Sequence, residues 1–242
     1  MRAIVELQDV SKQFGGLKAV SGFTGIIEEG SIVGLIGPNG AGKTTLFNMI
    51  AATFPPTSGS IIYDGMDITR KKTHDMAKLG LARTFQVTKP FGDMSVTENI
   101  MVGAFRQTND RKAALETANK IYDQIEMNCG RDQLAHNLTT VDRKKLEIAR
   151  ALATGPKLLL LDEVMAGCNP HEKNELVEVV REIRDGGVTI IIIEHDIKTI
   201  MTLCEKIIVL HRGEKLVEGT PQEVANDQRA INAYLGEEYR NA

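Results

Sequence analysis

The sequence predicts an α/β fold with a mainly parallel core sheet, a β-rich region at the N-terminus and an inserted helical region. Continuous apolar runs at residues 158–161 and 188–193 lack the alternation of a half-exposed strand, as is typical of parallel strands covered on both faces. Segments rich in Val and Ile before residue 37 favour further strands. From about residue 87 to 155 apolar residues recur every three or four positions, which indicates helices.

The first third of the chain is predicted to form strands interrupted by a glycine-rich loop. Before the loop we expect three strands, at residues 4–10, 17–27 and 31–36. The loop spans residues 37–42, and the segment KTTLFNMIAA after it places Leu46 and Ile50 at a helical spacing. Two shorter strands are predicted at residues 61–63 and 81–85.

The inserted region contains two stretches with a clear helical face. In the first, the residues expected on one face are Leu115, Ala118, Ile121, Tyr122 and Ile125. In the second, RKKLEIARAL, they are Leu146, Ile148, Ala149 and Leu152.

After Pro156 the alternation of strands and helices resumes. We expect strands at 158–161 and 188–193 with a helix at 172–184 between them, then a hairpin of 207–210 and 215–218 joined through Arg212-Gly213. A final helix is expected within residues 221–235. There is no low-complexity linker or internal repeat, which favours one domain.

Composition excludes several classes of protein. The 242 residues carry 29 basic and 32 acidic side chains, and a net charge of −3 gives no support to nucleic-acid binding. Three widely spaced cysteines, Cys129, Cys168 and Cys204, favour reduced thiols over a disulfide framework, and we expect Cys168 to be a packing residue. The N-terminus lacks a signal-peptide pattern, and the aliphatic runs are too short to cross a membrane.

The most specific motif is GPNGAGKT at residues 37–44, which matches G-x-x-x-x-G-K-[ST] between a predicted strand and a predicted helix. Its glycines let backbone N–H groups surround phosphates, and the helix N-terminus adds partial positive charge. Lys43 is suited to neutralise the β- and γ-phosphates, and the Thr44 hydroxyl to bind Mg²⁺.

Acidic and imidazole side chains follow two other predicted strands. Asp162 and Glu163 end the run LLLLDE, at the strand end where ligands of open parallel sheets bind. Asp162 is suited to hold Mg²⁺ through water, and Glu163 to orient the attacking water or accept its proton. His195, in IIIIEHD, follows the next strand and could reach a γ-phosphate.

Together these motifs resemble the ATPase domain of ATP-binding-cassette (ABC) transporters over nearly the whole chain. The resemblance implies an ABC-type P-loop ATPase with a mainly parallel core sheet, an N-terminal antiparallel β subdomain and an inserted helical subdomain. It places the catalytic core at residues 1–86 and 156–242 and the helical subdomain at 87–155. ATP and Mg²⁺ are the implied cofactors.

The resemblance also assigns roles to individual residues. Phe14 would stack on adenine, Gln86 would contact Mg²⁺ and sense the γ-phosphate, Glu163 would be the catalytic glutamate and His195 the switch histidine. Residues 166–170 would form the loop that crosses to the partner subunit. Mg²⁺ would be held by Thr44, Gln86 and Asp162. The nucleotide would be held in addition by Gly37, Pro38, Asn39, Gly40, Ala41, Gly42, Lys43, Thr44, Thr45 and, across the subunit interface, Thr139 and Val141.

Within that family the chain is most similar to the ATPase subunits of branched-chain (hydrophobic) amino acid importers, on SKQFGGLKAV, LARTFQ, SVTENIMVGA, AGCNP and AYLGE. The implied partners are membrane-spanning permease subunits, a second ATPase subunit and, indirectly, a solute-binding protein. The implied location is peripheral, on the cytoplasmic face of the inner or plasma membrane. Phe91 and Met94 are candidate contacts to the permease, with core packing as the alternative.

Three other classes of protein share the phosphate loop. A regulatory GTPase would need an Asn-Lys-x-Asp motif, which the sequence lacks. A kinase of small metabolites would leave Gln86, Asp162, Glu163 and His195 unexplained. A non-transport ABC ATPase acting on ribosomes or DNA stays open as the alternative, although such proteins usually carry two cassettes or a long coiled-coil insertion.

The family signature, Leu-Ser-Gly-Gly-Gln, falls on Leu138–Asp142, which reads LTTVD. Thr139 or Thr140 can cap the following helix, whose free N–H groups would still point outward. Asp142 is expected to place a negative charge near the partner's nucleotide, offset in part by Arg143, Lys144 and Lys145. Since the signature acts on the partner's site, we expect a heterodimer with one standard and one weaker site, with a homodimer as the alternative.

Overall fold

The computed structural model describes residues 2–84 and 90–238, without the side chains of 234–238. The chain forms two compact units, residues 1–76 with 189–242, and residues 77–188. The second unit contains two strands as well as helices, so the predicted helical subdomain of residues 87–155 stays a prediction. Gln86 lies outside the described residues.

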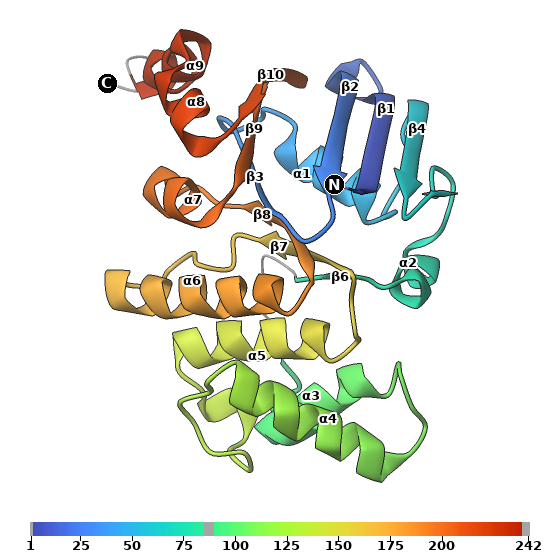
Figure 1. The fold of residues 1–242 in the computed structure, drawn as a ribbon, viewed down its shortest axis with the longest axis vertical. Helices are drawn as coiled ribbons and strands as arrows, with labels where there is room; N and C mark the ends of the chain where they lie inside the picture. The colour runs from blue at the N-terminus through green and yellow to red at the C-terminus, as the bar shows by residue number, and fades with distance from the viewer. Residues whose placement is uncertain (1, 85–89, 239–242) are drawn as a thin grey trace. The chain divides into compact units, whose positions relative to one another are not determined.

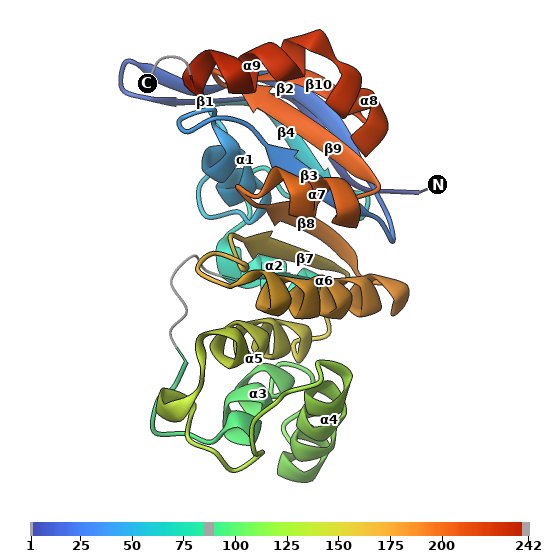
Figure 2. The same cartoon turned by 90° about the vertical axis from the view of Figure 1, so that its left-hand side faces the viewer.

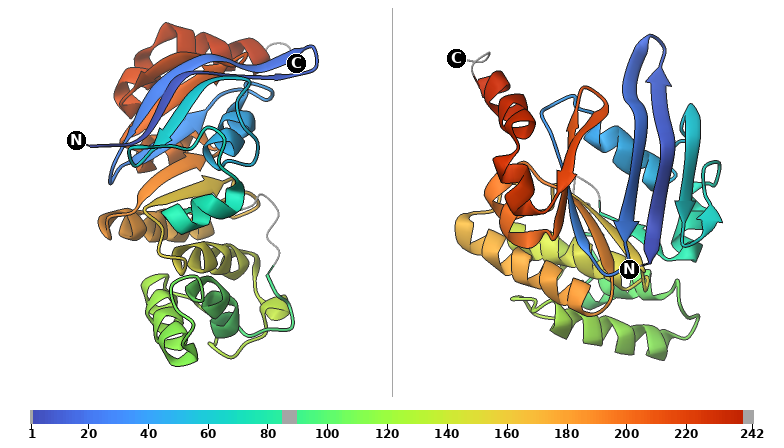
Figure 3. Two further views of the ribbon diagram at one scale, coloured as in Figure 1. Left: turned by 90° about the vertical axis from the view of Figure 1, so that its right-hand side faces the viewer. Right: turned by 45° about the horizontal axis from the view of Figure 1, so that its top comes forward.

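The first unit begins with an antiparallel sheet. Its strands are β1 (Ala3–Phe14), β2 (Leu17–Glu28), β4 (Ser58–Tyr63) and β5 (Met66–Asp67), in the order β2-β1-β4-β5. Figure 3 shows β1 and β2 as a long hairpin with β4 beside β1. This confirms the predicted antiparallel region, and β1 extends beyond the predicted residues 4–10 at both ends.

The first unit also contains the strands that carry the phosphate loop. They are β3 (Ile32–Ile36), β8 (Thr189–Ile193), β9 (Lys206–His211) and β10 (Glu214–Gly219), in the order β10-β9-β3-β8. Strand β3 is parallel to both β8 and β9, whereas β9 and β10 form the predicted antiparallel hairpin. Every residue of β3 and β8 is buried, as the continuous apolar runs predicted.

The helices that lie wholly or partly in this unit, among the described residues, are α1 (Lys43–Ile50), α2 (Thr73–Leu79), α7 (Ile197–Leu203), α8 (Pro221–Asn226) and α9 (Gln228–Glu238). Figures 1 and 2 show α8 and α9 beside β9 and β10. The prediction of a single terminal helix is wrong, because Asp227 is extended and its carboxylate accepts hydrogen bonds from the backbone of Arg229 and Ala230, starting a new helix.

The second unit pairs β6 (Leu81–Arg83) in parallel with β7 (Leu158–Asp162). Its long helices are α3 (Val96–Ala104), α4 (Arg111–Gln124), α5 (Thr140–Leu152) and α6 (Pro170–Asp185), with a short 3₁₀ turn at Ala135–Asn137. Figure 2 shows α3, α4 and α5 packed together. The strand predicted at 81–85 is shorter, since Thr84 lies outside β6.

Local sequence explains where these helices begin and how closely they pack. Ser95 and Glu98 form a reciprocal capping box at the start of α3. A Cβ at Gly103 would lie 2.2 Å from the Arg150 carbonyl oxygen, so only glycine lets α3 approach α5 here. The predicted apolar face of α5 is confirmed, whereas Leu115 of α4 is exposed and Ala114 is buried in its place. No described helix is both long enough and apolar enough to cross a membrane.

Candidate active site

The phosphate loop follows β3 directly and depends on two of its glycines. Gly37 and Gly42 have φ angles of 150° and 102°, which disfavour any other residue. A Cβ on Gly37 would lie 2.1 Å from the Leu210 carbonyl oxygen, and one on Gly42 would lie 2.4 Å from that of Ala19. The loop backbone is therefore pressed against its neighbours in a shape that only glycine permits at these positions.

Lys43 begins α1 and turns back over the loop. Its ammonium group donates to the carbonyl oxygens of Gly37 at 2.5 Å and Pro38 at 3.0 Å, and the side chain is buried. A buried cation at a helix N-terminus, surrounded by loop backbone, suits an anionic group such as a phosphate. Thr44, the next residue, is exposed, so its hydroxyl is accessible from solvent.

The carboxyl ends of β8 and β9 flank that of β3 because all three strands are parallel. His195 lies two residues beyond β8 and is exposed. This edge thus brings His195 and the phosphate loop to the same side of the sheet. Phe14, at the end of β1, is 47% exposed and stacks edge-on against Phe54, with ring centroids 5.4 Å apart.

In the second unit Asp162 ends β7 and is 4% exposed. Arg83 of β6 lies beside it, with 3.6 Å between guanidinium and carboxylate. Burial lowers the pKa of Arg83, and the Asp162 charge opposes that shift. The Asp162 N–H donates to the Thr84 hydroxyl at 3.2 Å, which fixes the end of the strand.

Glu163 has a φ of 51°, the left-handed region that residues other than glycine seldom adopt. Backbone strain of this kind concentrates at functional sites. The following turn is closed by the Ala166 N–H donating to the Glu163 carbonyl at 3.2 Å. An unusual backbone conformation therefore coincides with the residue that the sequence singled out as catalytic.

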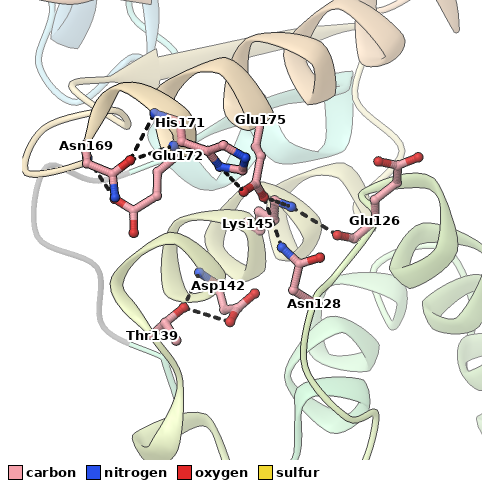
Figure 4. A network of polar contacts seen from close by, with 9 residues as sticks. All are labelled: Glu126, Asn128, Thr139, Asp142, Lys145, Asn169, His171, Glu172 and Glu175. Carbon is pink, nitrogen blue, oxygen red and sulfur yellow. Dashed lines mark hydrogen bonds and ion pairs between the residues drawn. The ribbon is translucent and has the colours of Figure 1, made fainter.

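The signature segment, Leu138–Asp142, ends in a closed polar pair (Figure 4). Thr139 is the N-cap of α5, which confirms the predicted capping: its hydroxyl accepts from the Asp142 N–H at 3.2 Å. The same hydroxyl donates to Asp142 Oδ2 at 2.7 Å. Both roles of the hydroxyl are therefore used within the helix start itself.

Asp142 itself is buried in the helix start. It is 4% exposed, and among the described residues Oδ1 has no hydrogen-bond partner. The Lys145 ammonium group bonds to other residues, and the expected charge of Asp142 near the partner's nucleotide, with its partial offset by basic neighbours, stays a prediction. A carboxylate at the third position of a helix is favoured by the N-terminal end of the helix dipole, which explains how Asp142 is accommodated.

Lys145 joins three segments of the second unit (Figure 4). Its ammonium group donates to the Glu126 carbonyl at 3.0 Å and to Glu175 of α6 at 2.8 Å. Asn128 donates to the same carboxylate oxygen at 3.0 Å, and the His171 ring lies 3.1 Å from the other oxygen. The hydrogen bond from Lys145 is the largest cause of a lowered Glu175 pKa.

Sequence reasoning missed this network, Arg83 and Asn99. The fully buried Asn99 accepts from the Phe91 N–H at 2.9 Å and donates to the carbonyls of Phe91, Met94 and Ser95. It therefore fixes the segment that carries both candidate permease contacts. Of these, Phe91 is 45% exposed and Met94 is half-buried. An asparagine directly before the apolar run Ile100–Val102 was the available signal.

This combination of parallel strands, phosphate loop and following helix defines a P-loop nucleotide-binding protein. Residues 20–166 match the family model described as ABC transporter, and residues 214–240 match one described as branched-chain amino acid ATP-binding cassette transporter. The chain belongs to the ABC transporter family, as an ATP-binding and ATP-hydrolysing cassette.

Relatives match over nearly their whole length. The chain is 36% identical to the high-affinity branched-chain amino acid transport ATP-binding protein BraF of Pseudomonas aeruginosa, covering 98% of this chain and 99% of BraF. It is 36% identical to LivG of Escherichia coli, another protein so described, with 97% and 98% covered. It is also 33% identical to the lipopolysaccharide export system ATP-binding protein LptB of Escherichia coli, with 98% and 99% covered.

Solved structures agree on the cassette fold. The ADP conformation of MJ1267, an ATP-binding cassette of an ABC transporter, matches with a TM-score of 0.87 and 28% identity, covering 98% of this chain and 100% of MJ1267. The cbiO1 protein of Clostridium perfringens, part of the ABC transporter complex cbiONQ, also matches with a TM-score of 0.87, at 26% identity, covering 98% and 100%. The predicted family and fold class are confirmed, and the alternative of a ribosome- or DNA-directed ATPase finds no support.

Proposed function

We propose that the chain powers an ABC importer for branched-chain or other hydrophobic amino acids or related small solutes. Overall sequence identity does not distinguish between possible cargoes, because the identity to the lipopolysaccharide export protein LptB, 33%, is close to the 36% identity to BraF. The observation that carries the proposal is the C-terminal match at residues 214–240 to a branched-chain amino acid cassette. That segment includes β10, α8 and α9.

Each candidate side chain has a role in ATP hydrolysis on this proposal. Residues Gly37–Thr45 hold the phosphates through backbone N–H groups, with Lys43 exchanging its two loop carbonyls for phosphate oxygens. Glu163 orients the attacking water and accepts its proton. His195 contacts the γ-phosphate from the end of β8, and Phe14 offers its exposed face to the adenine ring.

Thr44, Gln86 and Asp162 would hold Mg²⁺. Their side chains offer only oxygen ligands, which the ion prefers, and few protein carboxylates are needed where phosphate oxygens complete its coordination. The bound ion would neutralise charge that develops on the phosphate oxygens.

The proposed partners are membrane-spanning permease subunits and, indirectly, a solute-binding protein, with this chain peripheral on the cytoplasmic face of the membrane. Phe91 is the better candidate for a permease contact, since its ring is exposed while Asn99 holds its backbone. The Arg150 guanidinium lies 4.6 Å from the Phe91 ring centroid, which supports the ring from one side.

We further propose that the second ATPase subunit is a different chain. The signature segment would serve the partner's nucleotide through Thr139, Val141 and backbone N–H groups, yet the Thr139 hydroxyl already bonds Asp142 in both directions. Val141 is 7% exposed, so its side chain packs inward. This supports a pair with one standard site and one weaker site at the partner's phosphate loop.

ATP hydrolysis by the purified chain alone tests the choice of partner. A heterodimer subunit should turn over slowly and without cooperativity in ATP until its partner is added. Robust, cooperative turnover by the chain alone would establish a homodimer with a working divergent signature.

Transport itself is tested by uptake of radiolabelled leucine. The chain and its co-purifying permease subunits are expressed in cells that lack their own branched-chain uptake. Uptake should depend on the chain and be lost in the Glu163→Gln variant. Restored uptake of an unrelated solute, with none of leucine, isoleucine or valine, would reject the cargo while leaving the ATPase assignment intact.

A further inference from the structure

A pocket of about 400 Å³ lies in the first unit between the phosphate loop and the C-terminal segment. Residues 38–41 of the loop form one side. The β9–β10 hairpin and α9 supply the others, through His211, Arg212, Leu216, Arg229, Asn232 and Ala233. Of the described residues that line it, none is Lys43, Thr44 or Thr45. The volume falls within the range of ≈ 300–1,000 Å³ that is usual for small-molecule sites.

One positive charge at the pocket lacks a compensating partner. Arg229 is held by Asp227 through two hydrogen bonds, of 2.7 and 3.1 Å, which also hold the pKa of Asp227 at about 2. Arg212 is exposed and has no hydrogen-bond or ion-pair partner among the described residues. A guanidinium with its fork of donors free is suited to a carboxylate.

The remainder of the lining is partly apolar. Leu216 is half-buried and supplies accessible aliphatic surface to the pocket that Arg212 lines, whereas Ala41 and Ala233 are buried. A phosphate dianion would favour two or more uncompensated cations, whereas here Arg229 is already paired. The segment that matches the branched-chain cassette model contains Leu216 and the three lining residues of α9.

The pocket is connected to the phosphate loop by backbone contacts. The turn between β9 and β10 consists of Arg212 and Gly213, with φ angles of 50° and 84°, as in a type I′ hairpin. The Gly213 N–H donates to the Ala41 carbonyl at 2.9 Å. The Leu210 carbonyl abuts Gly37, so the hairpin contacts the phosphate loop at two points.

We propose that this pocket binds a small carboxylate that carries a short aliphatic group, at a site that shares loop residues 38–41 with the phosphate site but none of residues 43–45. The carboxylate pairs with Arg212, and the aliphatic group packs on Leu216. The affinity expected for one solvent-accessible pair and a small apolar contact corresponds to a Kd on the order of 1 mM. The inference does not depend on the cargo proposed for the transporter.

Isovalerate is the probe, and titration calorimetry and ligand-observed NMR on the full chain measure its binding. The neutral isostere isovaleramide has the same shape without the charge, and inorganic phosphate has charge without the aliphatic group. Arg212→Gln removes the guanidinium that is proposed to bind the carboxylate, and glutamine has backbone preferences similar to those of arginine. Arg70→Gln is the matched control, because Arg70 is also exposed in the first unit but lies outside this pocket.

We expect isovalerate to bind at least tenfold more tightly than isovaleramide or phosphate. Arg212→Gln should weaken isovalerate at least tenfold and Arg70→Gln less than twofold, while saturating Mg-ADP should leave isovalerate bound. Equal binding of the amide, tighter binding of phosphate, or an unchanged Kd in Arg212→Gln would each overturn the proposal. Displacement by Mg-ADP would show that the ligand occupies the nucleotide site instead. The comparison of acid with amide uses only the unmodified chain, so it stands even if the variant misfolds.

Discussion

The Lys145 ammonium group lies 2.8 Å from the Glu175 carboxylate and ties the signature helix α5 to α6. The lysine side chain is 3% exposed and the glutamate 26%. Replacing the carboxylate by an amide leaves a buried cation with neutral acceptors, such as the Glu126 carbonyl, and without the opposite charge of Glu175.

We therefore expect Glu175→Gln to lower the free energy of unfolding by about 2 kcal/mol, less than the ~3–5 kcal/mol of a fully buried pair. In thermal melting this corresponds to a midpoint about 4–8 °C lower for a chain of this size. The control is Glu178→Gln, on the same helix and paired with Arg181 at the exposed surface, which should change the midpoint very little. Equal changes in melting midpoint for the two variants would show that the Lys145–Glu175 pair does not stabilise the chain.

The same pair predicts a dependence of stability on pH. The pKa of Glu175 is lowered in the folded chain, first by the Lys145 hydrogen bond, so its contribution is complete above the unfolded pKa of about 4.3. The contribution is lost as the pH falls through the lower, folded pKa. The difference in melting midpoint between the wild type and Glu175→Gln should be constant from pH 7 to 5 and shrink below about pH 4.3. The same comparison of Glu175 with the Glu175→Gln variant in chains that carry His171→Gln excludes any effect of the neighbouring imidazole, which also faces Glu175.

Thr139 is predicted to act through its hydroxyl at the start of α5. Thr139→Ala removes the cap and takes from Asp142 Oδ2 its hydrogen bond from the hydroxyl, at a cost of about 1 kcal/mol or more. Thr139→Ser keeps the hydroxyl and should melt within a degree or two of the wild type. Urea denaturation compares them, and a Thr139→Ala chain as stable as the serine variant would refute the cap.

Alanine substitutions at Gly37 and Gly40 should have different effects, because only at Gly37 would the added Cβ clash with a neighbouring backbone atom. Gly37→Ala would drive a Cβ into the Leu210 carbonyl, so we expect loss of ATP binding together with a clearly lower melting midpoint. Gly40 also has a positive φ, but a Cβ there meets nothing within 4 Å. Gly40→Ala should therefore cost only about 1 kcal/mol of left-handed strain. Binding of a fluorescent ATP analogue and thermal melting distinguish the two outcomes.

Glu163→Gln should bind ATP with unchanged affinity and lose hydrolysis by a factor on the order of 10² or more, because the amide cannot accept the proton of the attacking water. Binding and turnover are measured on the chain with its partner subunits present. Asp185→Asn is a suitable control, since Asp185 is an exposed carboxylate at the end of α6. Undiminished hydrolysis in Glu163→Gln would remove this residue from the mechanism.

Local patterns predicted much of the fold. The strand–loop–helix around Lys43, the buried strands and the Arg212-Gly213 hairpin all follow from periodicity and turn chemistry that act within a few residues. Helix α3 was predicted only as part of the helical stretch at residues 87–155, and α2 and α7 were not predicted, because each has seven to nine residues, too few for a clear periodicity.

The signature segment shows the limit of such reasoning. Thr139 and Asp142 match the [ST]-x-x-[DE] pattern of a helix start, which is a signal that Asp142 folds back rather than outward. The partners of Lys145 could not be predicted, because Glu126 and Glu175 are brought to it by the packing of α5 against distant parts of the chain. The role of Arg83 depends in the same way on the pairing of β6 with β7.

The left-handed backbone of Glu163 has a consequence for how this position can vary. A side chain in that conformation costs about 1 kcal/mol that glycine would not. Folding alone would thus prefer a residue with no carboxylate, whereas the role in hydrolysis that we propose for this position requires one. Variants selected only for thermal stability should acquire glycine at position 163 and lose ATPase activity as a result. Stability and activity therefore favour different residues at this position.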